Sequence, residues 1–132
     1  MCGTPEYMAP ELFMKSGHDF AVDYWGLGIL LYELIQGEPP FTDPKQTIRG
    51  IKYAKFPIKI SSGGKSIIQN FAKLQPAMRL GNLRNGFDDI FKHHWFDSFS
   101  WSTFNTQSMK APWIPQLDHE TDVRYFKSAS KL

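Results

Sequence analysis

Histidine, cysteine and carboxylate side chains could supply acid–base, metal-binding or nucleophilic chemistry, but their spacing in this sequence completes no catalytic set. His93 and His94 are adjacent, so a regular helix cannot direct both rings at one ligand. His18 and His119 lie far from that pair, and no metal site is expected. Cys2 has no evident base beside it, which argues against a thiolate nucleophile.

Glycine and acidic residues provide a second set of candidates. Gly63-Gly64 is a bare pair before a helical pattern, and we interpret it as a linker rather than a phosphate-binding loop. Glu33 is the acid that most needs an explanation, because it lies in an otherwise apolar helical pattern. A carboxylate at the solvent end of a helix and a functional carboxylate explain it equally well. Glu11 and Arg79 are ordinary when each is taken alone.

The stretch Asp23–Gln36 has to position Glu33, and its composition predicts a central helix. Apolar and aromatic residues fall on every side of a 3.6-residue period, which is typical of a helix buried all round. The stretch is shorter than the roughly 20 residues that a membrane span requires. Gly26 and Gly28 each cost a helix about 1 kcal/mol relative to alanine, so we expect a neighbouring backbone close to them. Asp23 suits the exposed N–H groups of the first turn.

The rest of the chain predicts shorter helices separated by proline and glycine. Gly37 and the prolines after it end the central helix, and Ser61 or Ser62 is placed to cap a later one. We expect helices at 11–16, 64–74 and 87–93, and in the last of these Ile90 and Phe91 should face inward. Residues 42–60 should form a connector with at most one helical turn, near 45–50. An aromatic-rich tail follows Asp97. No strand pattern is present, so the predicted fold class is mainly α.

Composition narrows the class of protein. The 132 residues suffice for one domain, and a 15% share of aromatic residues supplies material for a core. A net charge of +2 argues against a nucleic-acid partner. One cysteine permits no internal disulfide, and no signal peptide or membrane span is recognised. We therefore expect a soluble, cytoplasmic domain.

Several motifs occur in the order seen in protein kinases. The stretch CGTPEYMAPE at residues 2–11 resembles the end of an activation segment with its A-P-E motif. Residues 17–28 and 32–34 are similar to the loop and central helix of the large lobe. The R-L-G-N, N-G and H-W-F motifs at residues 79–82, 85–86 and 94–96 are typical of the AGC group. The phrasing of residues 17–34 most resembles cGMP-dependent protein kinases, with cAMP-dependent kinases next.

This resemblance implies the fold and its organisation. The chain would form part of the large, C-terminal lobe of a protein-kinase-like fold, without the sheet of the small N-terminal lobe. Residues 1–96 would be a partial C-lobe, and residues 97–132 would begin the AGC C-terminal extension. The parent enzyme would use ATP and Mg²⁺ to phosphorylate Ser or Thr in basic protein or peptide sequences, under cGMP control.

The resemblance also assigns substrate contacts to the N-terminal loop and the central helix. The residues implied to face the substrate are Thr4, Pro5, Glu6, Tyr7, Met8 and Glu33. Thr4 would favour Ser/Thr substrates, while Pro5 and Met8 would line the pocket for the residue after the phosphoacceptor. The two acids and the tyrosine would bind basic side chains that precede it.

Four further residues would support the active site or touch the nucleotide. Asp23 would hold the catalytic loop by its backbone N–H groups. Glu11 and Arg79 would form a buried ion pair of the large lobe. Phe126 would approach the adenine edge of the ATP site. No catalytic residue and no metal ligand of the family falls within this chain.

The departures from the family pattern bear on activity. The 132 residues contain no Gly-rich phosphate loop, no strand lysine, and no H-R-D or D-F-G motif. Without these motifs the phosphates and Mg²⁺ lack ligands, so the chain alone is expected to bind no ATP and to be inactive. The segment at 42–48 is also shorter than the family pattern, by about six residues or nearly two helical turns. We expect a kinase fragment whose partner is the remaining N-terminal part; the alternatives are a non-catalytic peptide-binding module and a non-functional truncated product.

Overall fold

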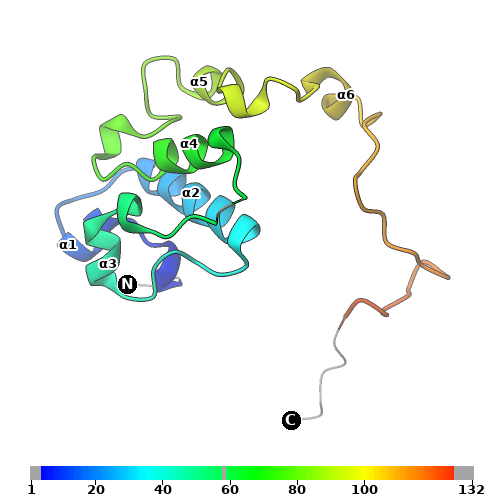
Figure 1. The fold of residues 1–132 in the computed structure, drawn as a ribbon, viewed down its shortest axis with the longest axis horizontal. Helices are drawn as coiled ribbons and strands as arrows, with labels where there is room; N and C mark the ends of the chain where they lie inside the picture. Colours follow the sequence, from blue (N-terminus) through cyan, green and yellow to red (C-terminus); the bar gives the residue numbers. More distant parts are fainter. Residues whose placement is uncertain (1–3, 58, 127–132) are drawn as a thin grey trace, which may run out of the picture. The chain divides into compact units, whose positions relative to one another are not determined.

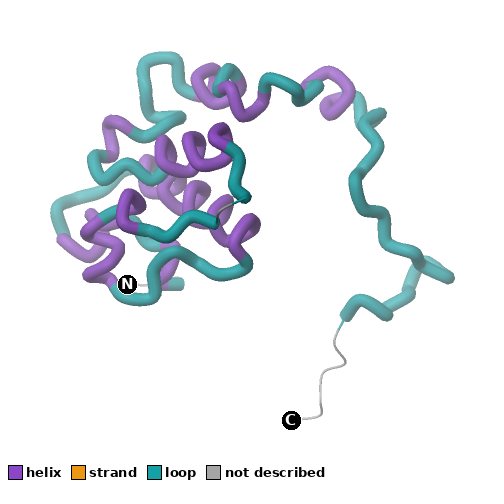
Figure 2. The backbone as a smooth tube through the Cα atoms, viewed as in Figure 1, coloured by secondary structure: helices purple, strands orange, loops and turns teal. Residues whose placement is uncertain are grey.

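A computed structural model describes residues 4–57 and 59–126 of the chain. The chain divides into two compact units, Met1–Phe99 and Ser100–Leu132. All regular elements in the described ranges are helical, with no strand among them, as the ribbon and tube show (Figures 1 and 2). The mainly α fold class predicted from the sequence is confirmed.

The helices of the first unit are short, with one exception. The α-helices are α1 (Pro10–Met14), α2 (Ala21–Gln36), α3 (Pro44–Arg49), α4 (Ser62–Phe71) and α5 (Phe87–Phe91). The 3₁₀ helices are η1 (Pro5–Tyr7), η2 (Ile51–Tyr53), η3 (Pro76–Met78) and η4 (His94–Phe96). In the second unit, α6 (Trp101–Asn105) precedes a described stretch of turns and irregular backbone.

Local sequence sets both ends of α2. At the start, the Asp19 carboxylate accepts a hydrogen bond from the backbone N–H of Ala21 at 2.8 Å, while Asp23 lies exposed in the first turn. At the end, Gly37 adopts φ 89°, the left-handed conformation that glycine takes without a Cβ penalty. The helix therefore ends where the sequence predicted. Asp19, which no sequence pattern had indicated as a cap, holds the first turn.

The core of the first unit forms where α2 packs against α4. The buried cluster consists of Ala9, Trp25, Ile29, Tyr32, Phe41, Ile51, Ile67, Ile68, Phe71, Ala72 and Leu80. Trp25 stacks on Phe41 with ring centroids 6.2 Å apart. Each large apolar side chain that is fully buried contributes roughly 1.5–3 kcal/mol, so this contact accounts for much of the driving force for folding.

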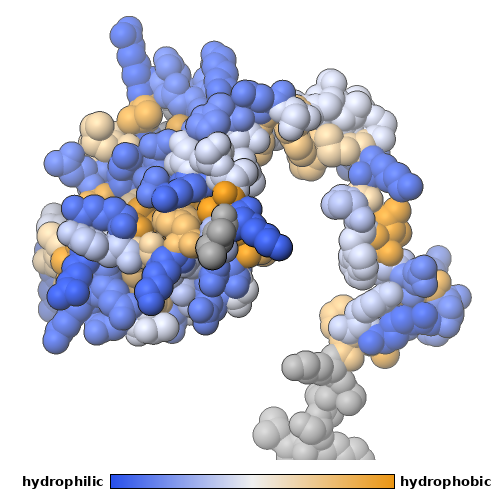
Figure 3. Space-filling model, in the orientation of Figure 1, coloured by the Kyte–Doolittle hydropathy of each residue, from blue (hydrophilic) through white to orange (hydrophobic). Residues whose placement is uncertain are grey.

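The prediction that α2 is buried on all sides is wrong for the described structure. Trp25 and Ile29 are fully buried, but Leu30 is 41% and Leu34 is 72% exposed. The packing of α4 and η1 against α2 covers one side of the helix and leaves the opposite apolar side in contact with solvent. Figure 3 shows one face of this unit, on which apolar surface reaches the outside between hydrophilic side chains.

The connector after α2 is more helical than predicted. In place of at most one turn, α3 runs from Pro44 to Arg49. Asp43 caps it by accepting a hydrogen bond from the backbone N–H of Lys45 at 2.9 Å, and Pro44 occupies the first turn, where its missing N–H is no loss. A capped start can support a short helix even in this shortened segment.

Other predicted helix boundaries shift by a few residues. Ser61 caps α4 by accepting the Gly64 backbone N–H at 3.0 Å, so α4 begins at Ser62 and ends at Phe71 rather than spanning 64–74. The first short helix ends at Met14 rather than at residue 16, because Lys15 adopts φ 52°.

The helix predicted at residues 87–93 is shorter, and only half of its inward face is confirmed. α5 ends at Phe91. Ile90 packs against the core as predicted, whereas Phe91 is 48% exposed. A helix of little more than one turn directs few side chains toward one surface, so it does not bury both Ile90 and Phe91.

Candidate functional site

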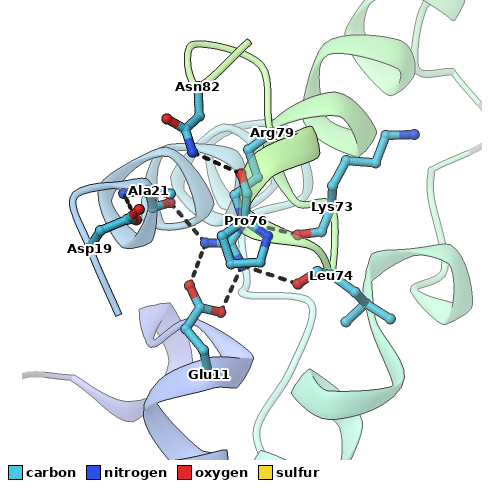
Figure 4. A network of polar contacts seen from close by, with 8 residues as sticks. All are labelled: Glu11, Asp19, Ala21, Lys73, Leu74, Pro76, Arg79 and Asn82. Carbon is cyan, nitrogen blue, oxygen red and sulfur yellow. Dashed lines mark hydrogen bonds and ion pairs between the residues drawn. The ribbon is translucent and has the colours of Figure 1, made fainter. Parts of the chain in front are cut away.

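The ion pair between Glu11 and Arg79 joins α1 to the turn after η3. The two terminal nitrogens of Arg79 reach the two carboxylate oxygens of Glu11 at 2.6 and 2.8 Å, as Figure 4 shows. The Arg79 side chain is fully buried and Glu11 is 6% exposed. The bidentate, buried contact implied by the family resemblance is therefore present in the structure.

The remaining donors of Arg79 are also satisfied. Its Nε donates to the backbone carbonyl of Lys73 at 2.9 Å, and one terminal nitrogen also donates to the carbonyl of Ala21 at 2.8 Å (Figure 4). Its guanidinium carbon lies 5.3 Å from the centroid of the Trp25 ring. A buried charge is tolerated only when it is paired and its hydrogen bonds are made, and both conditions hold here. Arg79 thus ties α1, the start of α2 and the chain after α4 together.

The N-terminal loop contacts α2 through Tyr7 and Glu33. The Tyr7 hydroxyl donates a hydrogen bond to the Glu33 carboxylate, and both side chains are half-buried. This hydrogen bond raises the pKa of Tyr7, with further contributions from burial and from the negative charges of Glu33 and Glu6. Tyr7 therefore stays protonated and keeps the carboxylate oriented toward the loop.

A hollow of about 310 Å³ lies between this loop and the first two turns of α2. It is lined by Thr4, Tyr7, Met8, Ala9, Leu12, Val22, Asp23 and Gly26. The structure thus brings Thr4, Tyr7, Met8 and Asp23, four of the predicted site residues, to one surface depression. Pro5 and Glu6 lie in the same turn, η1, as Tyr7.

Four lining residues, Ala9, Leu12, Val22 and Gly26, were not among the site residues predicted from the sequence. Leu12 and Val22 form part of the apolar wall of the hollow. In the sequence they look like any other apolar residue of a helix, and only the packing of α1 and α2 places them beside the loop. The sequence contains no signal that would have selected them.

Phe126 is described in a different unit from the other predicted site residues. It is 77% exposed, and its backbone N–H donates to the carbonyl of Val123 at 2.8 Å. Its neighbourhood is held by Arg124, which pairs with Asp118 and with Asp122, the latter at 2.7 Å.

The hollow does not have the donor set for Mg-ATP. Phosphates need cationic side chains and clustered backbone N–H groups, and Mg²⁺ needs several oxygen ligands. No lysine or arginine lines the hollow, and residues 4–57 and 59–126 hold no group of three or more His, Cys, Asp or Glu placed to bind a metal ion. The lining instead consists of Asp23, the hydroxyl-bearing residues Thr4 and Tyr7, and apolar or small residues. In the same ranges no helix has the length and apolar character to cross a membrane.

Comparison with known families identifies the family of this chain. Residues 1–96 match the family described as protein kinase domain. The chain belongs to the protein kinase family. The kinase chain is 43% identical over 131 residues to human cGMP-dependent protein kinase 2, a match that covers 95% of the chain and 17% of that protein.

Other relatives of the kinase chain agree with this assignment. It is 46% identical over 131 residues to cGMP-dependent protein kinase, isozyme 1, of Drosophila melanogaster, again with 95% of the chain and 17% of that protein covered. It is 38% identical over 133 residues to the cAMP-dependent protein kinase catalytic subunit PRKX of Mus musculus, with 97% and 37% covered. The resemblance to AGC-group kinases read from the motifs is confirmed. The chain spans less than two fifths of the length of each of these relatives.

Proposed function

We propose that the kinase chain is the peptide-binding part of a Ser/Thr kinase large lobe and that it recognises basic residues before the phosphoacceptor. The observation that carries this proposal is the contact of Tyr7 in η1 with Glu33 in α2, beside the hollow that Thr4, Met8 and Asp23 line. This contact places a carboxylate and an aromatic ring on the same surface. Both are features that a guanidinium group binds.

The arrangement favours arginine in particular. The Tyr7 hydroxyl engages one oxygen of Glu33, which leaves acceptor capacity on the other oxygen for an incoming N–H group. Glu6, in the same turn as Tyr7, adds a second negative charge near the ring. An arginine side chain would stack on the tyrosine and donate to the carboxylate, since its planar fork suits both contacts.

The neighbouring hollow would take the residue after the phosphoacceptor. Met8 and Ala9 give it an apolar wall, and Pro5 shapes the turn that precedes them. Thr4 lines the opening, where it would favour Ser/Thr substrates in the complete enzyme. Asp23 would hold the catalytic loop of that enzyme, and the Glu11–Arg79 pair would support the site by fixing α1 against α2.

For the whole protein, family membership supports the proposal of a kinase activity. The parent kinase would transfer the γ-phosphate of Mg-ATP to protein substrates, with residues 1–96 as part of its large lobe and residues 97–132 as the start of its C-terminal extension, near whose end Phe126 would reach the adenine. Like the relatives named for cGMP dependence, it would be regulated by cGMP. We also propose that it is located in the cytoplasm. The present chain alone would bind peptide and transfer no phosphate.

Peptide binding by the 132-residue chain tests the proposal. A fluorescein-labelled peptide with two arginines before a serine should bind the chain in fluorescence polarisation, and its alanine counterpart should bind more weakly. Glu33→Gln removes one charge-assisted hydrogen bond, worth about 1.5–3 kcal/mol, so the dissociation constant should rise about ten- to a hundredfold. Exposed Glu38 offers a matched control, and Glu38→Gln should change affinity less than twofold.

Two results would contradict the proposal. Equal affinity for the arginine and alanine peptides would show that the surface does not read basic residues. Saturable micromolar binding of Mg-ATP in titration calorimetry, or phosphate transfer to the peptide by the chain alone, would contradict its proposed lack of catalysis.

A further inference from the structure

Leu74, just after α4, lines two hollows in the surface of the first unit. The first, of about 590 Å³, has Ile51, Ala72 and Met78 among its walls, with Lys52 and Lys73 also lining it. The second, of about 570 Å³, is formed largely by apolar residues and prolines, Pro10, Met14, Ile48 and Pro76. Neither hollow shares a residue with the depression at Thr4 and Asp23.

The apolar side chains around these hollows are accessible to a ligand. Met14, Ile48, Leu74 and Met78 are between 41% and 57% exposed. Scattered single apolar residues on a surface are normal, but four around a pair of adjoining hollows form a patch. Such a patch, edged by polar side chains, is typical of a protein-binding surface.

The Leu74 side chain lies close to the backbone of Gly50. Gly50, between α3 and η2, has φ 89°, and a Cβ placed on it would lie 3.0 Å from two side-chain carbons of Leu74. Glycine at this position lets the leucine side chain lie directly against the backbone. Leu74 therefore packs against Gly50 on one side and remains 43% exposed between the two hollows.

The charge that lines the first hollow is positive. Lys52 and Lys73 line the first hollow, which has no acidic residue, and among the described residues neither lysine forms an ion pair. The Lys52 ammonium lies 4.9 Å from the centroid of the Tyr53 ring. The carboxylate that lines the second hollow, Glu11, is already paired with Arg79. A ligand here would bring the negative charge.

We propose that the two hollows at Leu74 bind an acidic peptide segment that places one apolar side chain in each hollow. The peptide would straddle Leu74 and direct a carboxylate at Lys52 and Lys73. A peptide fits better than a fatty acyl chain, because an acyl chain needs one continuous enclosed channel and this surface has two hollows open to solvent. The site uses none of the residues that the proposed function needs for arginine recognition.

The test uses the full 132-residue chain and a panel of fluorescein-labelled acidic nonapeptides. Each peptide carries two leucines, placed two, three or four positions apart, among Asp and Glu residues. At least one spacing should give saturable binding in fluorescence polarisation. Leu74→Gln should raise its dissociation constant at least tenfold, and so should the double substitution Lys52→Glu with Lys73→Glu.

Matched controls separate this site from general charge effects and from the arginine site. Lys59 and Lys110 are exposed and line neither hollow, so the double variant Lys59→Glu with Lys110→Glu should bind the peptide within twofold of the unchanged chain. Glu33→Gln should also leave this affinity unchanged. Circular dichroism checks that each variant keeps its helices.

Four outcomes would overturn the proposal. The first is that no peptide of the panel binds. The second is that a folded Leu74→Gln variant binds as well as the unchanged chain, and the third is that a lysine-for-acid version of the best peptide binds equally well. Preference for dodecanoate or for anionic phosphatidylserine vesicles over every peptide would assign the hollows to a lipid and would also reject the peptide.

Discussion

Gly28 in α2 faces Phe71 at the end of α4 so closely that the two helices leave no room for a side chain between them. A Cβ on Gly28 would lie 2.9 Å from the Cβ of Phe71 and 3.2 Å from the backbone nitrogen of Ala72. Gly26, two residues earlier, is different: its nearest neighbour would be the Tyr7 carbonyl oxygen at 3.8 Å, an ordinary contact. Both glycines were expected to mark a close approach, and the structure confirms this for Gly28 alone.

Alanine substitutions at these two glycines should have opposite effects. Gly28→Ala forces α2 and α4 apart, and overpacking of this kind typically costs about 1–3 kcal/mol of stability. Gly26→Ala meets no clash, so the better helix propensity of alanine should stabilise the chain by up to about 1 kcal/mol. Urea unfolding followed by circular dichroism measures both. Equal effects at the two positions would show that α2 and α4 do not pack in this way.

Removal of Arg79 should be among the most damaging single changes in the chain. Arg79→Ala leaves the Glu11 carboxylate buried without its partner, an arrangement that typically costs about 3–5 kcal/mol. Arg79→Ala combined with Glu11→Gln should recover part of this loss, because the uncompensated charge is then gone. Urea midpoints of the single and double variants test the coupling, and additive losses would contradict a direct ion pair.

The exposed apolar side of α2 should make the isolated chain self-associate. Leu30 and Leu34 lie on this side, and each leucine left in water forgoes roughly 1.5–3 kcal/mol of burial free energy. Leu30→Glu together with Leu34→Lys should reduce association in light scattering without loss of helical signal. Ile29→Lys, at a fully buried position of the same helix, should unfold the chain instead. Undiminished association of the double variant would mean that another surface is responsible.

His93 joins α4 to η4 through both ring nitrogens. Its Nδ1 accepts the Trp95 backbone N–H at 3.1 Å, so in this geometry the proton of the neutral ring is on Nε2, which donates to the Ser66 hydroxyl oxygen at 3.2 Å. That oxygen also accepts a hydrogen bond from the Asn70 side-chain amide at 3.3 Å. The ring also stacks on His94, with centroids 4.4 Å apart. Burial lowers the pKa of His93, the charge of His94 lowers it further, and Asp97 opposes the shift.

This shift predicts a loss of stability in mild acid. A histidine with a folded-state pKa below the unfolded value of about 6.5 contributes stability that is complete above pH 6.5. That contribution declines as the pH falls from about 6.5 toward the folded-state pKa, because the unfolded chain takes up the proton first. The free energy of unfolding at pH 7.5, 6.5 and 5.5 should therefore fall less in His93→Gln than in the unchanged chain. His18→Gln, at an exposed position, should follow the unchanged chain, and identical slopes in all three would refute the coupling.

Much of the organisation of this chain could be predicted from short-range signals. The C-terminal end of α2 follows from Gly37, the start of α4 from Ser61, and the mainly α class from the absence of any strand pattern. These signals act over a few residues, so they remain readable without the rest of the fold. The kinase motifs were readable for the same reason, since each is a local string of residues.

The tertiary structure alone decided which sides of the elements meet. The α2 sequence is apolar all round, so no periodicity selects the side that holds Trp25 and Ile29 for burial; the contact with α4 makes that choice. The resemblance led us to expect Glu11 and Arg79 together, yet that contact spans 68 positions, and no local pattern encodes it. The hollows at Asp23 and at Leu74 likewise arise only where separate segments pack, because a cavity belongs to the arrangement of the elements and not to any one of them.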